Sequence, residues 1–143
     1  MATEISKGLK WTFFINFIVS LVFGVLLFFL VEVYLGWLGI DNFQVPFNIG
    51  GFFGGALLAF SSASFIAWKQ TEWEKVKILV IMNIVWNMLG AYIFYWVVIG
   101  RWSFGGGFLI QPMILLHFIL FFGFLAAFIF FYIQHEKEKT VSN

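Results

Sequence analysis

The chain has 143 residues, of which 62% are hydrophobic and 10% are charged, and its mean hydropathy is +0.98. Since a soluble domain carries about 25% charged residues, this composition excludes an ordinary soluble domain and a disordered chain, and it leaves an integral membrane protein. The net charge of +1 provides no basic tract that would neutralise a row of phosphates, and the absence of cysteine excludes disulfides, thiolate metal sites and iron–sulfur clusters.

Four runs are long and apolar enough to cross a bilayer, which takes about 20 residues in a helix. They cover residues 11–35, 48–68, 76–99 and 108–133. The connectors between them are short, and short connectors join helices that lie antiparallel as neighbours. The sequence therefore predicts an all-α, up-down-up-down four-helix membrane bundle that forms one domain over residues 1–143.

The basic residues are distributed unevenly between the two sides of this bundle. The lysines precede the first span, flank the second connector and follow the last span, whereas the other two connectors contain Arg101 alone. Positively charged segments stay in the cytoplasm, so both termini are expected there, in a multi-pass protein of the cell membrane. Trp11 and Trp73 fall at span ends on the lysine-rich side, where indole rings favour the membrane interface.

The second span is rich in small residues. On a helical wheel of 100° per residue, one side contains Gly51, Gly54, Gly55 and Ser62, with Ala59 at its edge. Such faces let helix backbones approach closely. We favour packing against the first or third span, and the alternatives are a homo-oligomer seam and close contact with a ligand.

The third span carries Asn83 and Asn87 four residues apart, with Gly90 on the same stripe. A carboxamide facing lipid would leave its donors and acceptor without partners, so this stripe should face the bundle interior. The asparagines either join helices by hydrogen bonds, or Asn87 forms the floor of a pocket together with Trp86.

His117 is the only histidine, and Glu32 the only acidic residue, inside the predicted spans. His117 has no carboxylate at its depth with which to bind a metal, so we expect a neutral imidazole bonded to a hydroxyl, amide or carbonyl. Glu32 lies near the outer end of the first span, where it can reach water, pair with Arg101 or join Gln111 in an outward-facing polar mouth. His135, in the C-terminal tail, is expected to be solvated.

The sequence shows no combination of residues typical of a catalytic site. Asp41 is the sole aspartate and falls in a connector, and no paired carboxylates share one depth. The sequence therefore predicts no enzyme, no metal site and no cofactor.

A family resemblance rests on the layout of nearly the whole chain. The first span ends in Leu35-Gly36-Trp37, a glycine-rich second span leads into a charged turn, and the third span contains Asn87-Met88-Leu89-Gly90. In these features the chain resembles small four-helix membrane proteins of the DoxX-like group and their uncharacterised relatives. Members of that group are often accessory subunits or proteins without assigned activity, so the resemblance implies a fold more than a function.

Two functions remain after these exclusions. The first is a structural or accessory membrane protein, in contact with membrane lipids and not with nucleic acid, that assembles with itself or with another membrane protein through its glycine-rich face. The alternative is a carrier or binder of a small hydrophobic molecule or lipid, in an outward-opening pocket inside the bundle. That pocket would be formed by Glu32, Trp86, Asn87, Trp96, Gln111 and His117.

Overall fold

The computed structural model describes residues 4–37, 47–103 and 112–142. Within these ranges the chain forms five helices: α1 (Lys7–Phe29), α2 (Val31–Trp37), α3 (Phe47–Lys69), α4 (Trp73–Ser103) and α5 (Pro112–Ser142). All but α2 are long and apolar enough to cross a membrane. The all-helical architecture predicted from the sequence is confirmed.

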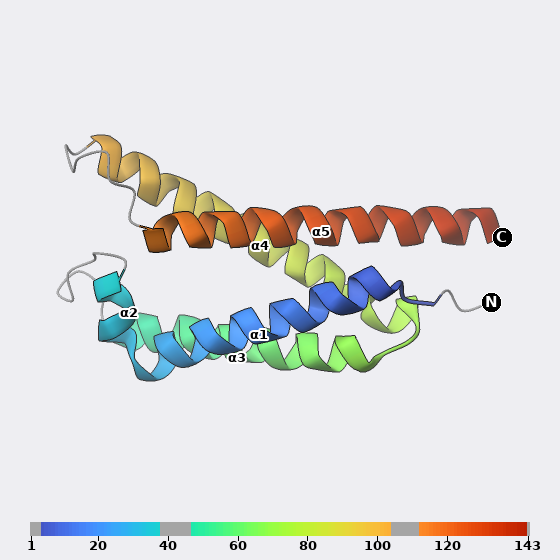
Figure 1. Ribbon diagram of the computed structural model, residues 1–143, viewed down its shortest axis with the longest axis horizontal. Coiled ribbons are helices and arrows are strands. Elements are labelled where there is room, and N and C mark those ends of the chain that lie inside the picture. The colour runs from blue at the N-terminus through green and yellow to red at the C-terminus, as the bar shows by residue number, and fades with distance from the viewer. Residues whose placement is uncertain (1–3, 38–46, 104–111, 143) are drawn as a thin grey trace.

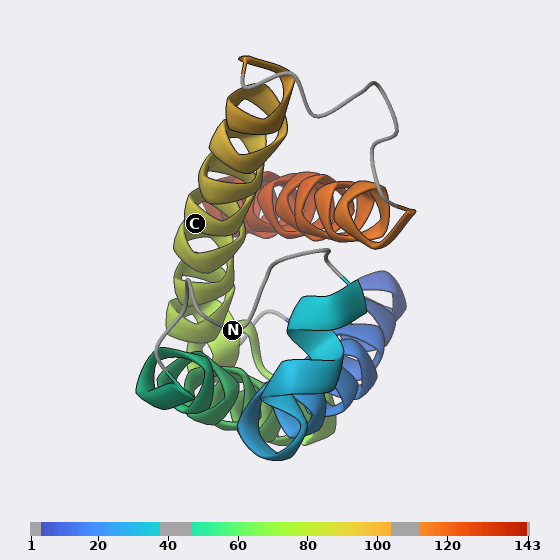
Figure 2. The same cartoon turned by 90° about the vertical axis from the view of Figure 1, so that its left-hand side faces the viewer.

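The long helices alternate in direction and form two antiparallel pairs (Figure 1). α1 packs along α3, α4 packs along α5, and both chain termini lie at the same end of the molecule. We call this end, which contains Lys7 and the turn between α3 and α4, the charged end, and the opposite end the far end. α4 diverges from α3 towards the far end, so the two pairs separate there (Figures 1 and 2).

The first predicted span is not one continuous helix, and this prediction was wrong. α1 ends at Phe29, and Leu30 leaves the helical region with φ −129° and ψ 40°. Neither proline nor glycine marks the break. The change of direction buries Val31, Tyr34 and Leu35 of α2 against Ile114 of α5. Tertiary packing, which local sequence does not encode, therefore sets the end of α1.

The last helix is longer than predicted. α5 has 31 residues and continues to Ser142, so at 1.5 Å per residue it is about 46 Å long, against about 30 Å of bilayer hydrocarbon. Its final turns are held by polar contacts, because Gln134 donates to Glu138 over 3.0 Å and Lys139 pairs with Glu74 of α4 over 2.7 Å. The charged C-terminal residues extend the helix instead of ending it.

The small-residue face of α3 that contacts α1 is rotated from the predicted one. A Cβ on Gly54 would lie 2.5 Å from the backbone nitrogen of Phe28, whereas a Cβ on Gly51 would meet nothing within 4 Å. Ala59 and Ser62 are exposed. The glycine pairs 50/54 and 51/55 are each spaced by four residues, and the second pair is offset from the first by one residue. One residue turns a helix by about 100°, so the helical wheel defines the contact face only to within that angle.

A buried apolar cluster fills the charged end. It joins all four long helices and the segment before α1, and it comprises Ile5, Leu9, Phe13, Ala67, Trp73, Val76, Val80 and Phe128. The N-terminal segment is tied to it, because the Ile5 N–H donates to the Thr71 carbonyl over 2.9 Å. This end of the molecule is a packed core.

His135 belongs to this packed end, so the prediction that it is solvated was wrong. The extension of α5 places its fully buried ring on the Trp73 indole, with ring centroids 4.7 Å apart. Nδ1 lies 2.8 Å from the Phe131 carbonyl, which only accepts, and Nε2 accepts from the Ser6 N–H over 3.2 Å. The ring is therefore the neutral tautomer with its proton on Nδ1.

Candidate functional site: a cavity between the helix pairs

A layer of asparagines closes the packed end towards the middle of the molecule. Asn16 of α1 donates through Nδ2 to the Ser64 hydroxyl of α3 over 2.8 Å and to Oδ1 of Asn83 of α4 over 2.9 Å. Asn83 and Asn87 donate to backbone carbonyls of their own helix, over 2.8 and 2.7 Å. Both α4 asparagines are buried, so the stripe faces the interior, as the sequence predicts.

A cavity of about 470 Å³ lies on the far side of this layer, between the helix pairs. All five helices contribute to it, and its walls are mainly apolar: Phe23, Leu27, Leu57, Ile93, Leu120 and Phe124. Glycines allow the walls to approach, because a Cβ on Gly90 of α4 would overlap the Phe121 ring of α5. The molecule is thus packed at the charged end and hollow towards the far end.

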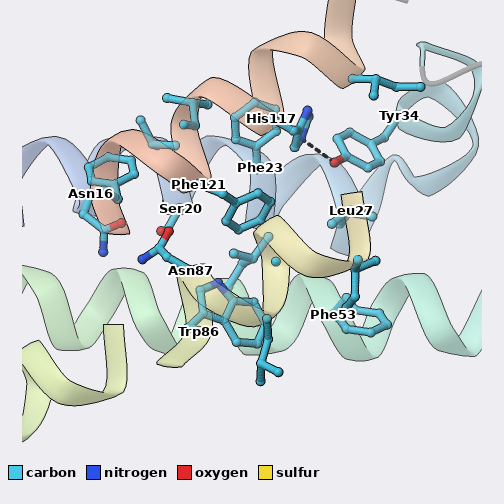
Figure 3. A pocket seen from close by; sticks show the side chains of 18 of the residues that line it. Asn16, Ser20, Phe23, Leu27, Tyr34, Phe53, Trp86, Asn87, His117 and Phe121 are labelled. Carbon is cyan, nitrogen blue, oxygen red and sulfur yellow. Dashed lines mark hydrogen bonds between the residues drawn. The ribbon is translucent and has the colours of Figure 1, made fainter. Parts of the chain in front are cut away.

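The polar side chains of the cavity form two groups (Figure 3). Asn16, Ser20 and Asn87 lie at one side of the view. At the other side the Tyr34 hydroxyl is 2.6 Å from Nε2 of His117, and both side chains are buried. This hydrogen bond joins α2 to α5, so the break after α1 places Tyr34 against His117.

The structure gathers three of the predicted pocket residues around this one cavity. Trp86, Asn87 and His117 line it. Glu32 does not, and this part of the predicted pocket needs correction: Glu32 is exposed, because it follows the inward-facing Val31 by one residue and so points away from the bundle. The side chain of Trp96 and the whole of Gln111 lie outside the described residues.

The wall between α3 and α4 gives access to the cavity from the side of the bundle. The rings of Phe60 and Trp86 pack against each other across these helices, tilted by 33° and with centroids 4.7 Å apart. Farther from the charged end, Phe53, Leu89 and Ile93 line the cavity and yet are 43%, 50% and 50% exposed. The opening therefore lies where α4 diverges from α3. The predicted outward mouth includes Gln111, which lies outside the described residues.

Sequence reasoning missed Asn16, Ser20 and Tyr34 as cavity residues. Asn16 and Ser20 are four residues apart in an apolar span, as are Asn83 and Asn87. Two polar pairs of equal spacing, on helices that meet, are a signal that the two stripes face each other. Tyr34 offered no comparable signal, because its position depends on the break at Leu30.

Comparison of the chain with protein-family models, with curated proteins and with solved structures finds no match. The function is therefore inferred from the cavity and from the distribution of charge.

Proposed function

We propose that the protein is a multi-pass protein of the cell membrane, with both termini in the cytoplasm, that binds or carries a small hydrophobic molecule or lipid. Four apolar helices of sufficient length support the insertion. The lysines Lys7, Lys10, Lys69 and Lys75 cluster at the charged end and support its cytoplasmic placement. The observation that carries the function is the apolar cavity between the helix pairs.

The size of the cavity favours a binding site over a packing defect. Protein interiors are close-packed, with few voids larger than a water molecule. A volume of about 470 Å³ falls within the roughly 300–1,000 Å³ of small-molecule sites, and it is about three times that of an engineered apolar cavity that admits benzene. A few polar groups among apolar walls are also the usual composition of such sites.

The position of the opening favours entry from the lipid phase. The exposed residues at its border, Phe53, Leu89 and Ile93, are apolar, and α3 and α4 both have the composition of membrane-spanning helices. A molecule dissolved in the bilayer reaches the cavity between these helices without crossing water. This route suits an apolar ligand better than a polar one.

Filling the cavity is expected to abolish binding. Val19 lines the cavity, whereas its neighbour Ile18 is exposed and does not. We expect Val19→Trp to lower labelling of the cavity by a photoreactive alkyl diazirine at least about tenfold, because the indole occupies the ligand's volume. The protein would be reconstituted in lipid nanodiscs, and the labelled residues would be mapped by peptide mass spectrometry.

Ile18→Trp is the matched control, since it adds the same ring to the outer surface one residue away. It is expected to leave labelling of Leu120 and Phe124, two cavity residues, at the level of the parent. Equal cavity labelling in the parent and in Val19→Trp would contradict the proposed function.

The accessory role predicted from the sequence, and the resemblance to DoxX-like proteins, stay predictions. Native mass spectrometry of gently extracted protein separates the two functions. A stoichiometric protein partner or a homo-oligomer would favour assembly, with Gly51 and Ser62 on the outer face of α3 as the first residues to alter. A monomer that retains one small molecule would favour the carrier.

A further inference from the structure

The orientation of the three asparagine amides is fixed by backbone carbonyls. The Leu79 carbonyl faces the Asn83 amide and the Asn83 carbonyl faces the Asn87 amide, over 2.8 and 2.7 Å. A carbonyl only accepts, so the facing atom is Nδ2 in both asparagines. Oδ1 of Asn83 therefore points to Asn16, whose facing atom must be its own Nδ2. The oxygen of each amide is thereby assigned.

This arrangement leaves oxygen atoms for the cavity. Asn16 uses both hydrogens of Nδ2 for Ser64 and Asn83, and Asn87 turns Nδ2 towards its own helix. Within the described part of the chain, Oδ1 of Asn16, Oδ1 of Asn87 and the Ser20 hydroxyl make no hydrogen bond to protein.

These three oxygens face the cavity. Among the described residues, every buried side-chain nitrogen or oxygen that has no accessible surface has a hydrogen-bond partner. The three oxygens have no such partner, so each of them must border accessible space. Asn16, Ser20 and Asn87 are only 5%, 7% and 3% exposed, and the cavity is the space that all three line. A buried polar group without a partner is costly, so the wall is built to meet a polar group of the ligand.

The chemistry of the wall selects that polar group. Two amide oxygens only accept hydrogen bonds, and no Lys, Arg, Asp or Glu is among the described residues that line the cavity. A carboxylate or phosphate would face these oxygens with no cation to balance its charge. A ketone, ester or ether brings only an acceptor, which would leave both amide oxygens without a donor. A hydroxyl group donates and remains neutral.

We infer that the cavity binds a neutral apolar alcohol, whose hydroxyl donates its single hydrogen to the amide oxygen of Asn87, beside that of Asn16, while its hydrocarbon part fills the space towards Tyr34 and His117. The inference rests on the proposed function, since it names the class of ligand for the same cavity. Ser20 completes the polar group, because its hydroxyl can both donate to and accept from the ligand.

The test compares two probes with the same carbon chain, one with a hydroxyl donor and one in which a methyl group replaces the hydroxyl hydrogen. A twelve-carbon alcohol with a diazirine in its chain, and the methyl ether of that alcohol, are incorporated separately into nanodiscs that contain the parent protein. We expect the alcohol to label cavity residues about tenfold more than the ether. Equal labelling by the two probes would overturn the inference and leave the proposed function standing. Labelling of outer surfaces alone by both would contradict the proposed function itself.

Substitutions locate the preference on the polar wall. Asn87→Leu keeps a side chain of similar size and removes the acceptor, so it should reduce labelling by the alcohol to the level of the ether. Ser20→Ala, a smaller change, should lower the preference about threefold and gives a second reading if Asn87→Leu does not fold. Ser62→Ala, on the outer face of α3, is the control and should retain the preference. A full preference in both Asn87→Leu and Ser20→Ala would overturn the assignment.

Discussion

Replacing Gly54 by leucine is expected to force α1 away from α3 and to destabilise the protein. A Cβ at this position would lie 2.5 Å from the backbone nitrogen of Phe28 and 2.8 Å from its Cα. A side chain can change rotamer to relieve such an overlap, but backbone atoms can move only with the whole helix. Since small residues at close helix contacts are a main source of association in membranes, we expect a loss of about 3 kcal/mol or more in unfolding free energy.

Gly51→Leu is the matched control for this variant. Gly51 lies on the same helix three residues earlier, and a Cβ there meets nothing within 4 Å. Unfolding of both variants would be followed by circular dichroism in mixed micelles as the fraction of denaturing detergent rises. Only Gly54→Leu should unfold earlier than the parent. Identical unfolding of Gly54→Leu and Gly51→Leu would show that α1 does not approach α3 at Gly54.

The comparison of these two glycines shows how far the sequence determines the fold. The lengths of the apolar runs and of the connectors sufficed to predict an all-helical architecture with four long helices, because an apolar run of about 20 residues has the length of a membrane-spanning helix. The face of each helix is a finer property. A helix that is apolar on nearly all sides has no polar face that would identify its buried side. The sequence therefore could not show whether Gly50 and Gly54 or Gly51 and Gly55 contact the neighbouring helix.

The candidate site was predictable only where polar residues mark it. Asn87 and His117 were found because polar groups inside a span must face the interior, and the structure lines one cavity with both. The prediction that Glu32 lines the pocket was wrong, because the break at Leu30 turns α2 and directs Glu32 outwards. Tyr34 was missed for the same reason, since its contact with His117 depends on that turn.

Truncation of Trp73 is expected to have the other large effect. The sequence placed this residue at the membrane interface, but its side chain is 0% exposed and is the largest among the fully buried side chains that the structure describes. It packs in the apolar cluster of the charged end, stacks on His135 and donates through Nε1 to Glu136 over 3.0 Å. Trp73→Ala removes all three contacts and leaves a cavity, so we expect a loss of about 3–5 kcal/mol.

Two control variants separate the causes of this loss. Trp11→Ala removes the same side chain from a position that is 62% exposed, and it should change the unfolding midpoint little. Trp73→Phe retains an aromatic ring but has no N–H for Glu136, so it should recover part of the loss and leave the share due to the hydrogen bond, about 1–3 kcal/mol. If Trp73→Ala and Trp11→Ala shift the midpoint equally, Trp73 is an interfacial residue and the packed charged end is wrong. If Trp73→Phe is as unstable as Trp73→Ala, the contact with Glu136, and not ring packing, holds α4 to α5.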